Sequence, residues 1–163
     1  MNKGMFVGVF LALICAFAAD AAAQNANLFA EHDKNLALLR KDLRAGKKEL
    51  VALNLPLTPS EATKFWPVYE TYSDEVAKIY DARYALIKEY ALSLNSMTDQ
   101  AAASIGKRSL DSDVAMTALR QKYAPIVAKI LPGKKAALFF QLDKRIGLLI
   151  DLQLASEIPL LVQ

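Results

Sequence analysis

Apolar side chains recur at helical spacing along most of the chain, and no stretch shows the period of two that is typical of a strand. The first such pattern predicts a helix over residues 28–53, which Pro56 ends because proline cannot continue a helix. We expect its buried seam to consist of two rows at a spacing of seven: Phe29, Leu36, Leu43 and Leu50, and His32, Leu39, Gly46 and Leu53.

A second helix begins at the clearest local signal in the chain. Thr58 can cap the free amides of the first turn, Pro59 suits the first helical position, and Glu61 completes a capping box. The apolar pattern continues to about Ala91. Its two rows are Phe65, Tyr72, Ile79 and Leu86, and Tyr69, Val76, Arg83 and Tyr90.

A third helix is predicted to start at Thr98 and to end at the Leu-Pro-Gly segment 131–133, and a fourth to cover residues 134–156. The first half of the third helix is small and polar along its seam, so we expect it to pack loosely or to face water. Its rows are Ile105, Ser112, Leu119 and Ile126, and Ser109, Met116, Tyr123 and Ile130.

The connections between these helices are short, which makes neighbouring helices antiparallel. Pro67 and Pro125 lie inside the second and third helices and each removes a backbone hydrogen bond, so we expect kinks there, the first near Thr63. The sequence therefore predicts an all-α fold of four long helices in antiparallel hairpins, which form a thin curved bundle.

The N-terminal segment has the layout of a secretory signal. Lys3 gives a positive start, residues 4–19 are uncharged and apolar, and small side chains lead up to Ala23. The apolar run is shorter than the roughly 20 residues that span a membrane. We therefore expect cleavage between Ala23 and Gln24, export to the periplasm, and a single helical domain at residues 24–163.

Composition narrows the possible classes of function. The 163 residues include 20 basic and 17 acidic side chains, and this mild excess is smaller than that of most dedicated nucleic-acid binders. The one cysteine, Cys15, lies in the segment that we expect to be removed. The exported chain would then have no disulfide and no thiolate metal site.

The sequence offers little support for catalysis or metal binding. His32 is the only histidine, and none of the residues at helical spacing from it can serve as a further metal ligand. No phosphate loop, nucleophile elbow or zinc-protease motif is present. We predict no enzyme, no catalytic residue and no cofactor. The acidic residues lie mostly off the apolar stripe and are interpreted as solvated: Glu70, Asp74, Glu75, Asp81, Glu89, Asp111 and Asp113.

A basic cluster at residues 40–48 is more informative. Arg40, Arg44 and Lys48 share one face of the first predicted helix at a spacing of four. This face is either simply solvated or attracts acidic partners, such as unfolded chains or the headgroups of anionic lipids.

The fourth predicted helix carries more apolar side chains between residues 138 and 154 than one side of a helix can bury in a hairpin. A second chain, the apolar segment 158–162 or a bound client protein would have to cover the remainder. Three further aromatic side chains, which lie beside or away from the apolar stripe, are candidates for exposure. The predicted contact residues are Phe139, Phe140, Trp66, Tyr80 and Tyr84, together with the basic Arg40, Arg44 and Lys48.

The Leu-Thr-Pro-Ser-Glu segment at residues 57–61 resembles the Leu-Thr-x-x-Gln motif of the Spy/CpxP family of periplasmic proteins, with Glu61 in place of glutamine. The signal segment, the chain length and the four helices are similar to that family as well. The segments 65–69 and 158–160 resemble more closely an uncharacterised exported proteobacterial group. The resemblance implies a helical homodimer that binds unfolded or stressed envelope proteins without ATP.

Two functions of different kinds follow from these observations. The first is an exported, ATP-independent chaperone or envelope-stress binding protein that contacts its clients through an amphiphilic helical surface. The alternative is a structural or regulatory module whose apolar excess forms a fixed interface with a second copy or with one partner. A periplasmic metal sensor is the least favoured possibility.

Overall fold

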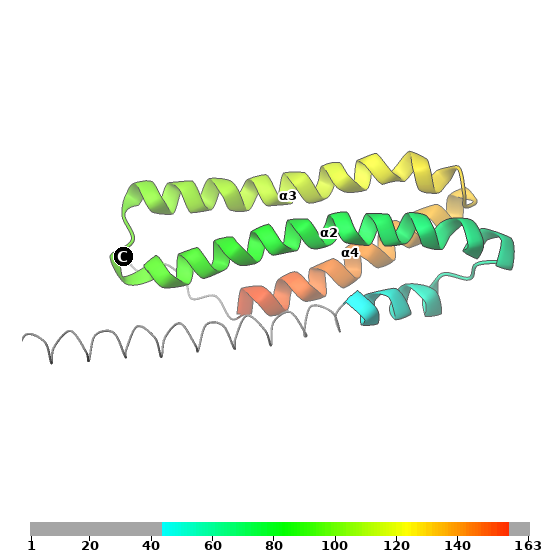
Figure 1. Ribbon diagram of the computed structural model, residues 1–163, viewed down its shortest axis with the longest axis horizontal. Helices are drawn as coiled ribbons and strands as arrows, with labels where there is room; N and C mark the ends of the chain where they lie inside the picture. Colours follow the sequence, from blue (N-terminus) through cyan, green and yellow to red (C-terminus); the bar gives the residue numbers. More distant parts are fainter. Residues whose placement is uncertain (1–43, 157–163) are drawn as a thin grey trace, which may run out of the picture. The chain divides into compact units, whose positions relative to one another are not determined.

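The computed structural model describes residues 44–156, with the side chains of residues 153, 154 and 156 left out. Every secondary-structure element in this range is helical, so the predicted all-α fold is confirmed (Figure 1). The signal segment, His32, Arg40 and the segment 158–162 lie outside the described residues. The elements are a helix at residues 44–54, α2 (Pro59–Ser93), the 3-10 turn η1 (Leu94–Ser96), α3 (Asp99–Ala128) and α4 (Gly133–Ser156).

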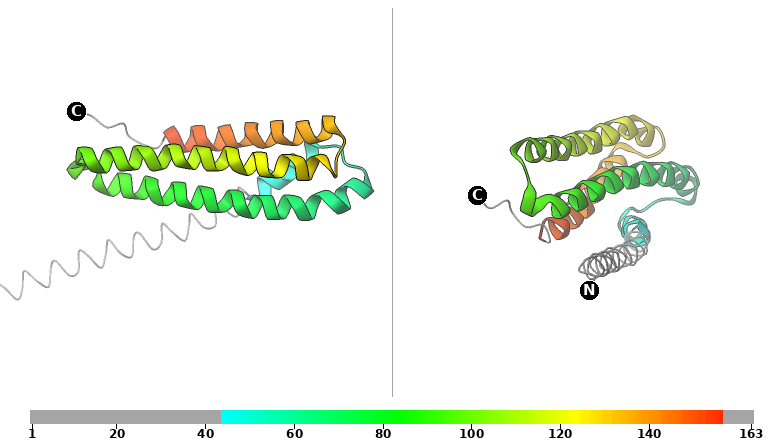
Figure 2. Two further views of the ribbon diagram at one scale, coloured as in Figure 1. Left: turned by 90° about the horizontal axis from the view of Figure 1, so that it is seen from above. Right: turned by 60° about the vertical axis from the view of Figure 1, so that its left-hand side comes forward.

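The chain divides into two compact units, Met1–Gly46 and Lys47–Gln163. Apart from residues 44–46, all that follows concerns the second unit. Within it, α2 and α3 form an antiparallel hairpin, and α4 turns back antiparallel to α3 (Figures 1 and 2). None of the helices in the described part of the chain has both the length and the apolar character needed to cross a membrane.

The predicted helix starts are confirmed in detail. The Thr58 hydroxyl accepts a hydrogen bond from the backbone N–H of Glu61 at 3.3 Å, and the Glu61 carboxylate accepts one from the Thr58 N–H at 2.7 Å. Thr98 caps α3 in a similar way, through the N–H of Ala101 at 3.2 Å. Pro67 and Pro125 lie inside α2 and α3, and neither proline ends its helix.

The core is concentrated where α2 begins, α3 ends and α4 begins. Phe139 of α4 is only 1% exposed, and its ring centroid lies 5.1 Å from that of Phe65 and 5.8 Å from that of Tyr72. Tyr72 also meets Tyr123 of α3 at 5.1 Å. Edge-to-face ring pairs of this kind stabilise the fold by more than the burial of their apolar area accounts for. We call this region, with its five rings Phe65, Tyr69, Tyr72, Tyr123 and Phe139, the aromatic end.

The opposite end of the hairpin has no such core. From residue 87 to residue 115, across the end of α2, η1 and the first half of α3, no side chain is buried. Ile105 and Ser112 are half-buried at most, and Leu110 and Val114 point outward and are about two-thirds exposed. The prediction that the first half of the third helix packs loosely or faces water is thereby confirmed. We call residues 87–115 the open end.

The predicted seam of the first helix is wrong in its described part. Leu50 and Leu53 are 45% and 75% exposed, whereas Val51 and Leu55 are buried. Lys47, Val51 and Leu55 are spaced by four and form the inner face. The helix turns this face inward because the ammonium group of Lys47 finds a buried carboxylate there.

The predicted buried row of α3 is also wrong at its last residue. Ile126 is 38% exposed and Val127 is buried instead. A strict seven-residue row drifts by about 20° per heptad on a straight α-helix, so its last member leaves the buried face.

Candidate functional site

The predicted contact residue Phe139 is not at the surface. It is enclosed by Phe65, Tyr69 and Tyr72 in the aromatic end, so its assignment as a client-binding anchor is corrected. The apolar pattern of α4 covers more than one face, and the sequence alone did not distinguish the face that packs on α2. Phe140 is half-buried beside Phe139, with a centroid distance of 4.8 Å.

The other three predicted aromatic residues are half-buried and belong to α2. The Trp66 ring lies edge-on to Phe65 at 5.2 Å and to Tyr69 at 5.4 Å. Tyr80 reaches toward α4 through its hydroxyl, and Tyr84 lies one turn further along α2. None of the three is a freely exposed ring.

Two residues of the predicted basic face, Arg44 and Lys48, lie in the described range, and Lys48 makes contacts within the chain. Lys48 forms an ion pair with Glu70, and its ammonium group lies 5.5 Å from the centre of the Trp66 ring. Lys47 points into the interior instead of into solvent. Arg44 is exposed, and Arg40 lies outside the described range. Within the described range, Lys48 is thus paired with an acidic residue, and Lys47 of the same basic cluster is turned away from solvent.

Three of the exposed apolar side chains lie close together on one face of α4. Leu148, Leu149 and Leu152 are 57%, 65% and 69% exposed. Leu152 is a neighbour of both other leucines on the helix surface, because it follows Leu149 by three residues and Leu148 by four. Lys144 and Arg145, one turn earlier, are exposed as well. We call these five residues the outer face of α4. The predicted apolar excess of this helix is thus present, and these leucines carry it.

The inner face of α4 carries a buried carboxylate. Asp143 is 0% exposed and accepts hydrogen bonds from Lys47 Nζ at 2.6 Å, Arg120 Nε at 2.9 Å and the Tyr72 hydroxyl at 2.8 Å. Burial by itself would raise the pKa of Asp143, but the charges and hydrogen bonds of these partners outweigh it and lower the pKa. Burial, and then the neighbouring Asp143 charge, raise the pKa of Tyr72.

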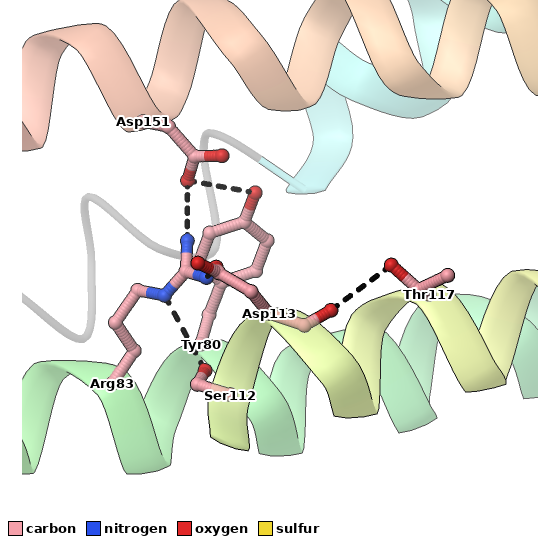
Figure 3. Close-up of polar contacts among 6 residues, drawn as sticks. All are labelled: Tyr80, Arg83, Ser112, Asp113, Thr117 and Asp151. Carbon is pink, nitrogen blue, oxygen red and sulfur yellow. Dashed lines mark hydrogen bonds and ion pairs between the residues drawn. The ribbon is translucent and has the colours of Figure 1, made fainter. Parts of the chain in front are cut away.

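A second polar junction lies two turns further along α4, and Figure 3 shows it in close-up. Arg83 of α2 donates from one terminal nitrogen to Asp151 of α4 at 2.7 Å and pairs through the other with Asp113 of α3. Its Nε donates to Ser112 at 3.4 Å. A single guanidinium group therefore joins three helices. Burial raises the pKa of Tyr80, whose hydroxyl lies 3.5 Å from Asp151, to about 12.

Gly147 lies between these two junctions on the inner face of α4. A Cβ atom at this position would come within 3.3 Å of a terminal nitrogen of Arg120 and 3.6 Å of the Tyr80 hydroxyl. The glycine therefore leaves room for a guanidinium group against the helix backbone. Asp143, Gly147 and Asp151 follow at a spacing of four, so α4 turns one polar stripe inward and the leucines outward.

Several acidic residues that the sequence assigned to solvated faces also bridge helices. Glu75 of α2 accepts from Lys122 at 2.6 Å and from the Tyr123 hydroxyl at 2.7 Å, and the Lys122 and Tyr123 hydrogen bonds lower its pKa. Arg108 of α3 donates to both carboxylate oxygens of Glu89 at 2.8 Å. These carboxylates are exposed or half-buried and hold α2 to α3.

Sequence reasoning missed the cluster around Asp143. Asp143 lies four residues after Phe139 and three before Ile146, within the apolar stripe of α4. A lone acid in such a stripe indicates a buried partner of opposite charge. Its partners could not have been named, because Lys47 is 96 residues away in the sequence.

Residues 44–156 include no group of three or more His, Cys, Asp or Glu side chains that could hold a metal ion. Comparison of the chain with protein-family models, with curated proteins and with solved structures returned no match. The candidate site is therefore defined by its geometry alone: an outward apolar and basic face on a helix whose inner side is fixed by ion pairs. Such a face can bind another molecule without any change to its own helix.

Proposed function

We propose that this chain is an exported, ATP-independent chaperone or envelope-stress binding protein that holds unfolded protein segments on the outer face of α4. The observation that carries the proposal is the exposure of Leu148, Leu149 and Leu152, each more than half accessible to solvent. Adjoining exposed leucines on a soluble protein mark an interaction site more often than leucines scattered singly.

The inner side of α4 supports this role. Asp143 and Asp151 tie the helix to α2 and α3 through Lys47, Arg120 and Arg83. Because these contacts hold α4 in place, the leucines stay on the outside and need not be uncovered before a client binds. Binding and release then need no nucleotide, since the leucines only exchange contact with water for contact with an apolar side chain of the client.

The proposed location is the periplasm, and it rests on the N-terminal segment of the sequence. A positive start, an apolar run and a small-residue site at Ala23 form the layout of a cleaved signal. A chain delivered there would meet proteins that are unfolded by stress in a compartment without ATP.

An aggregation assay tests the proposal directly. We expect the purified protein, at about equimolar ratio, to slow the light scattering of reduced α-lactalbumin. The variant Leu148→Gln/Leu149→Gln/Leu152→Gln should lose most of this effect, while its circular dichroism stays helical. Glutamine is a good helix former, so the changes remove apolar surface without disturbing α4.

The matched control changes equally exposed side chains on another helix. Leu110→Gln/Val114→Gln on α3 should keep full activity. If wild type leaves the aggregation curve unchanged, or if both variants lose activity alike, the assignment of function to the outer face of α4 is refuted.

The alternative, a fixed interface with a second copy or one partner, uses the same leucines and differs in stoichiometry. A stable oligomer that binds no hydrophobic dye, and that dissociates when the three leucines are changed, would favour it. Sedimentation velocity with dye binding on the same samples separates the two functions.

A further inference from the structure

We infer that the outer face of α4 selects unfolded segments in which acidic side chains adjoin apolar ones. This inference rests on the proposed function and names the class of client for the same surface. Its basis is the arrangement of charge on α4. Lys144 and Arg145 are exposed beside the exposed leucines, and the described residues provide neither cation with an ion-pair partner.

The positive and apolar parts of this surface are in contact with each other. Lys144 lies one turn before Leu148, and Arg145 lies one turn before Leu149, so each cation adjoins a leucine on the same side of the helix. From residue 144 to residue 152 the surface extends about 12 Å along the helix axis. A short client segment of about four extended residues matches this length.

Both acidic residues of α4 are engaged in ion pairs. Asp143 is buried against Lys47 and Arg120, and Asp151, whose side chain is 42% exposed, pairs with Arg83. Lys135, near the start of the helix, is bound to Glu61 at 2.6 Å. The exposed charges of α4 that have no ion-pair partner among the described residues are therefore positive: Lys134, Lys144 and Arg145.

This distribution favours one kind of ligand. A segment with leucines and glutamates can place its carboxylates on Lys144 and Arg145 while its leucines meet Leu148 and Leu152. A segment with leucines and lysines brings like charges together, which costs free energy. Exposed ion pairs are individually weak, so we expect a preference of about fivefold to tenfold.

Two fluorescein-labelled peptides with identical leucine positions test the inference, one carrying glutamates and the other lysines at the remaining positions. Fluorescence anisotropy with the full protein should give the lower Kd for the glutamate peptide. The difference in Kd between the two peptides should shrink as the salt concentration is raised from about 50 to about 500 mM, because salt screens the charges.

Charge variants locate the preference on α4. Lys144→Gln/Arg145→Gln should bind the two peptides with similar Kd. Lys64→Gln/Lys129→Gln removes the same net charge from exposed positions on α2 and after α3, and it should keep the wild-type preference. All four positions are exposed, so the fold is expected to tolerate both pairs of changes.

The outcomes separate the inference from the function on which it rests. Equal binding of both peptides by wild type, together with normal suppression of α-lactalbumin aggregation, overturns the inference alone. Failure to bind either peptide and to suppress aggregation overturns the proposed function as well. If the peptides fail to bind, but vesicles of phosphatidylglycerol bind wild type and not Lys144→Gln/Arg145→Gln, the occupant is a lipid surface and the inference is wrong.

Discussion

At the aromatic end, α2, α3 and α4 enclose five rings and one buried carboxylate, and the segment 51–55 adds the buried side chains of Val51 and Leu55. At the open end, residues 87–115 contain no buried side chain, and polar contacts such as Arg108 with Glu89 join α2 to α3. Buried rings contribute far more to the free energy of unfolding than exposed ion pairs do. Global stability should therefore depend on the aromatic end, and local opening should begin at the open end.

The largest expected effect comes from the centre of the aromatic end. Phe139→Ala should lower the free energy of unfolding by about 4 kcal/mol, because it removes a fully buried ring and leaves a cavity. Leu152→Ala, an exposed change on the same helix, should cost less than about 0.5 kcal/mol. Urea unfolding followed by circular dichroism measures both values. Equal losses would show that the two faces of α4 do not differ in burial.

Asp143→Asn should have the next largest effect. The amide leaves the buried ends of Lys47 and Arg120 without a counter-charge, which should cost about 3 kcal/mol at pH 7. Asp113→Asn breaks an ion pair whose carboxylate is largely exposed and should cost less than about 1 kcal/mol. A cost for Asp143→Asn no greater than that of Asp113→Asn would contradict the buried ion cluster.

The pH dependence of stability gives a second test of this carboxylate. The folded pKa of Asp143 lies below its unfolded value, so its stabilisation is complete above the unfolded pKa near 4 and is lost as pH falls through the folded pKa. Wild type should therefore lose more stability than Asp143→Asn between pH 5 and pH 2. Urea midpoints across this range measure the difference. Parallel curves for the two proteins would show that Asp143 is not the group responsible.

The smallest expected effect is local and concerns the junction of three helices. Arg83→Met should raise amide exchange in the last two turns of α4 by about fivefold to tenfold, since it releases Asp151 while the aromatic end stays intact. Arg108→Met breaks an exposed contact between α2 and α3 and should leave the exchange of α4 unchanged. If amide exchange in Arg83→Met rose equally in all helices, Arg83 would instead contribute to the stability of the whole bundle.

The features that could be predicted from the sequence depend on contacts between residues close together in the chain. Thr58, Glu61 and Thr98 fix helix starts through contacts three residues away, and the boundaries of α2, α3 and α4 follow the sequence signals within a few residues. The rows of α2 were predicted correctly because apolar residues occur mostly on one side of it: Phe65, Tyr69, Tyr72, Val76 and Leu86 are buried.

What could not be predicted depends on contacts between distant parts of the chain. Nothing in the basic cluster at residues 40–48 indicates that Lys47 points inward, yet it pairs with Asp143, and Leu50 and Leu53 of the same helix face outward. On α4, apolar side chains on several faces concealed which one is inside. Asp143 and Asp151 identify the inner face of α4, because their cationic partners lie on α2, on α3 and on the helix at residues 44–54.

The carboxylate of Asp143 also sets the register of α4. If the helix slid by one turn along its neighbours, Phe139 or Gly147 would meet Lys47 and Arg120 in place of a carboxylate. Apolar contacts tolerate such a slip because one apolar side chain can replace another. Lys47 and Arg120, which are 10% and 27% exposed, would instead lose their counter-charge. One acidic residue thus excludes the misaligned packings that a purely hydrophobic helix would allow.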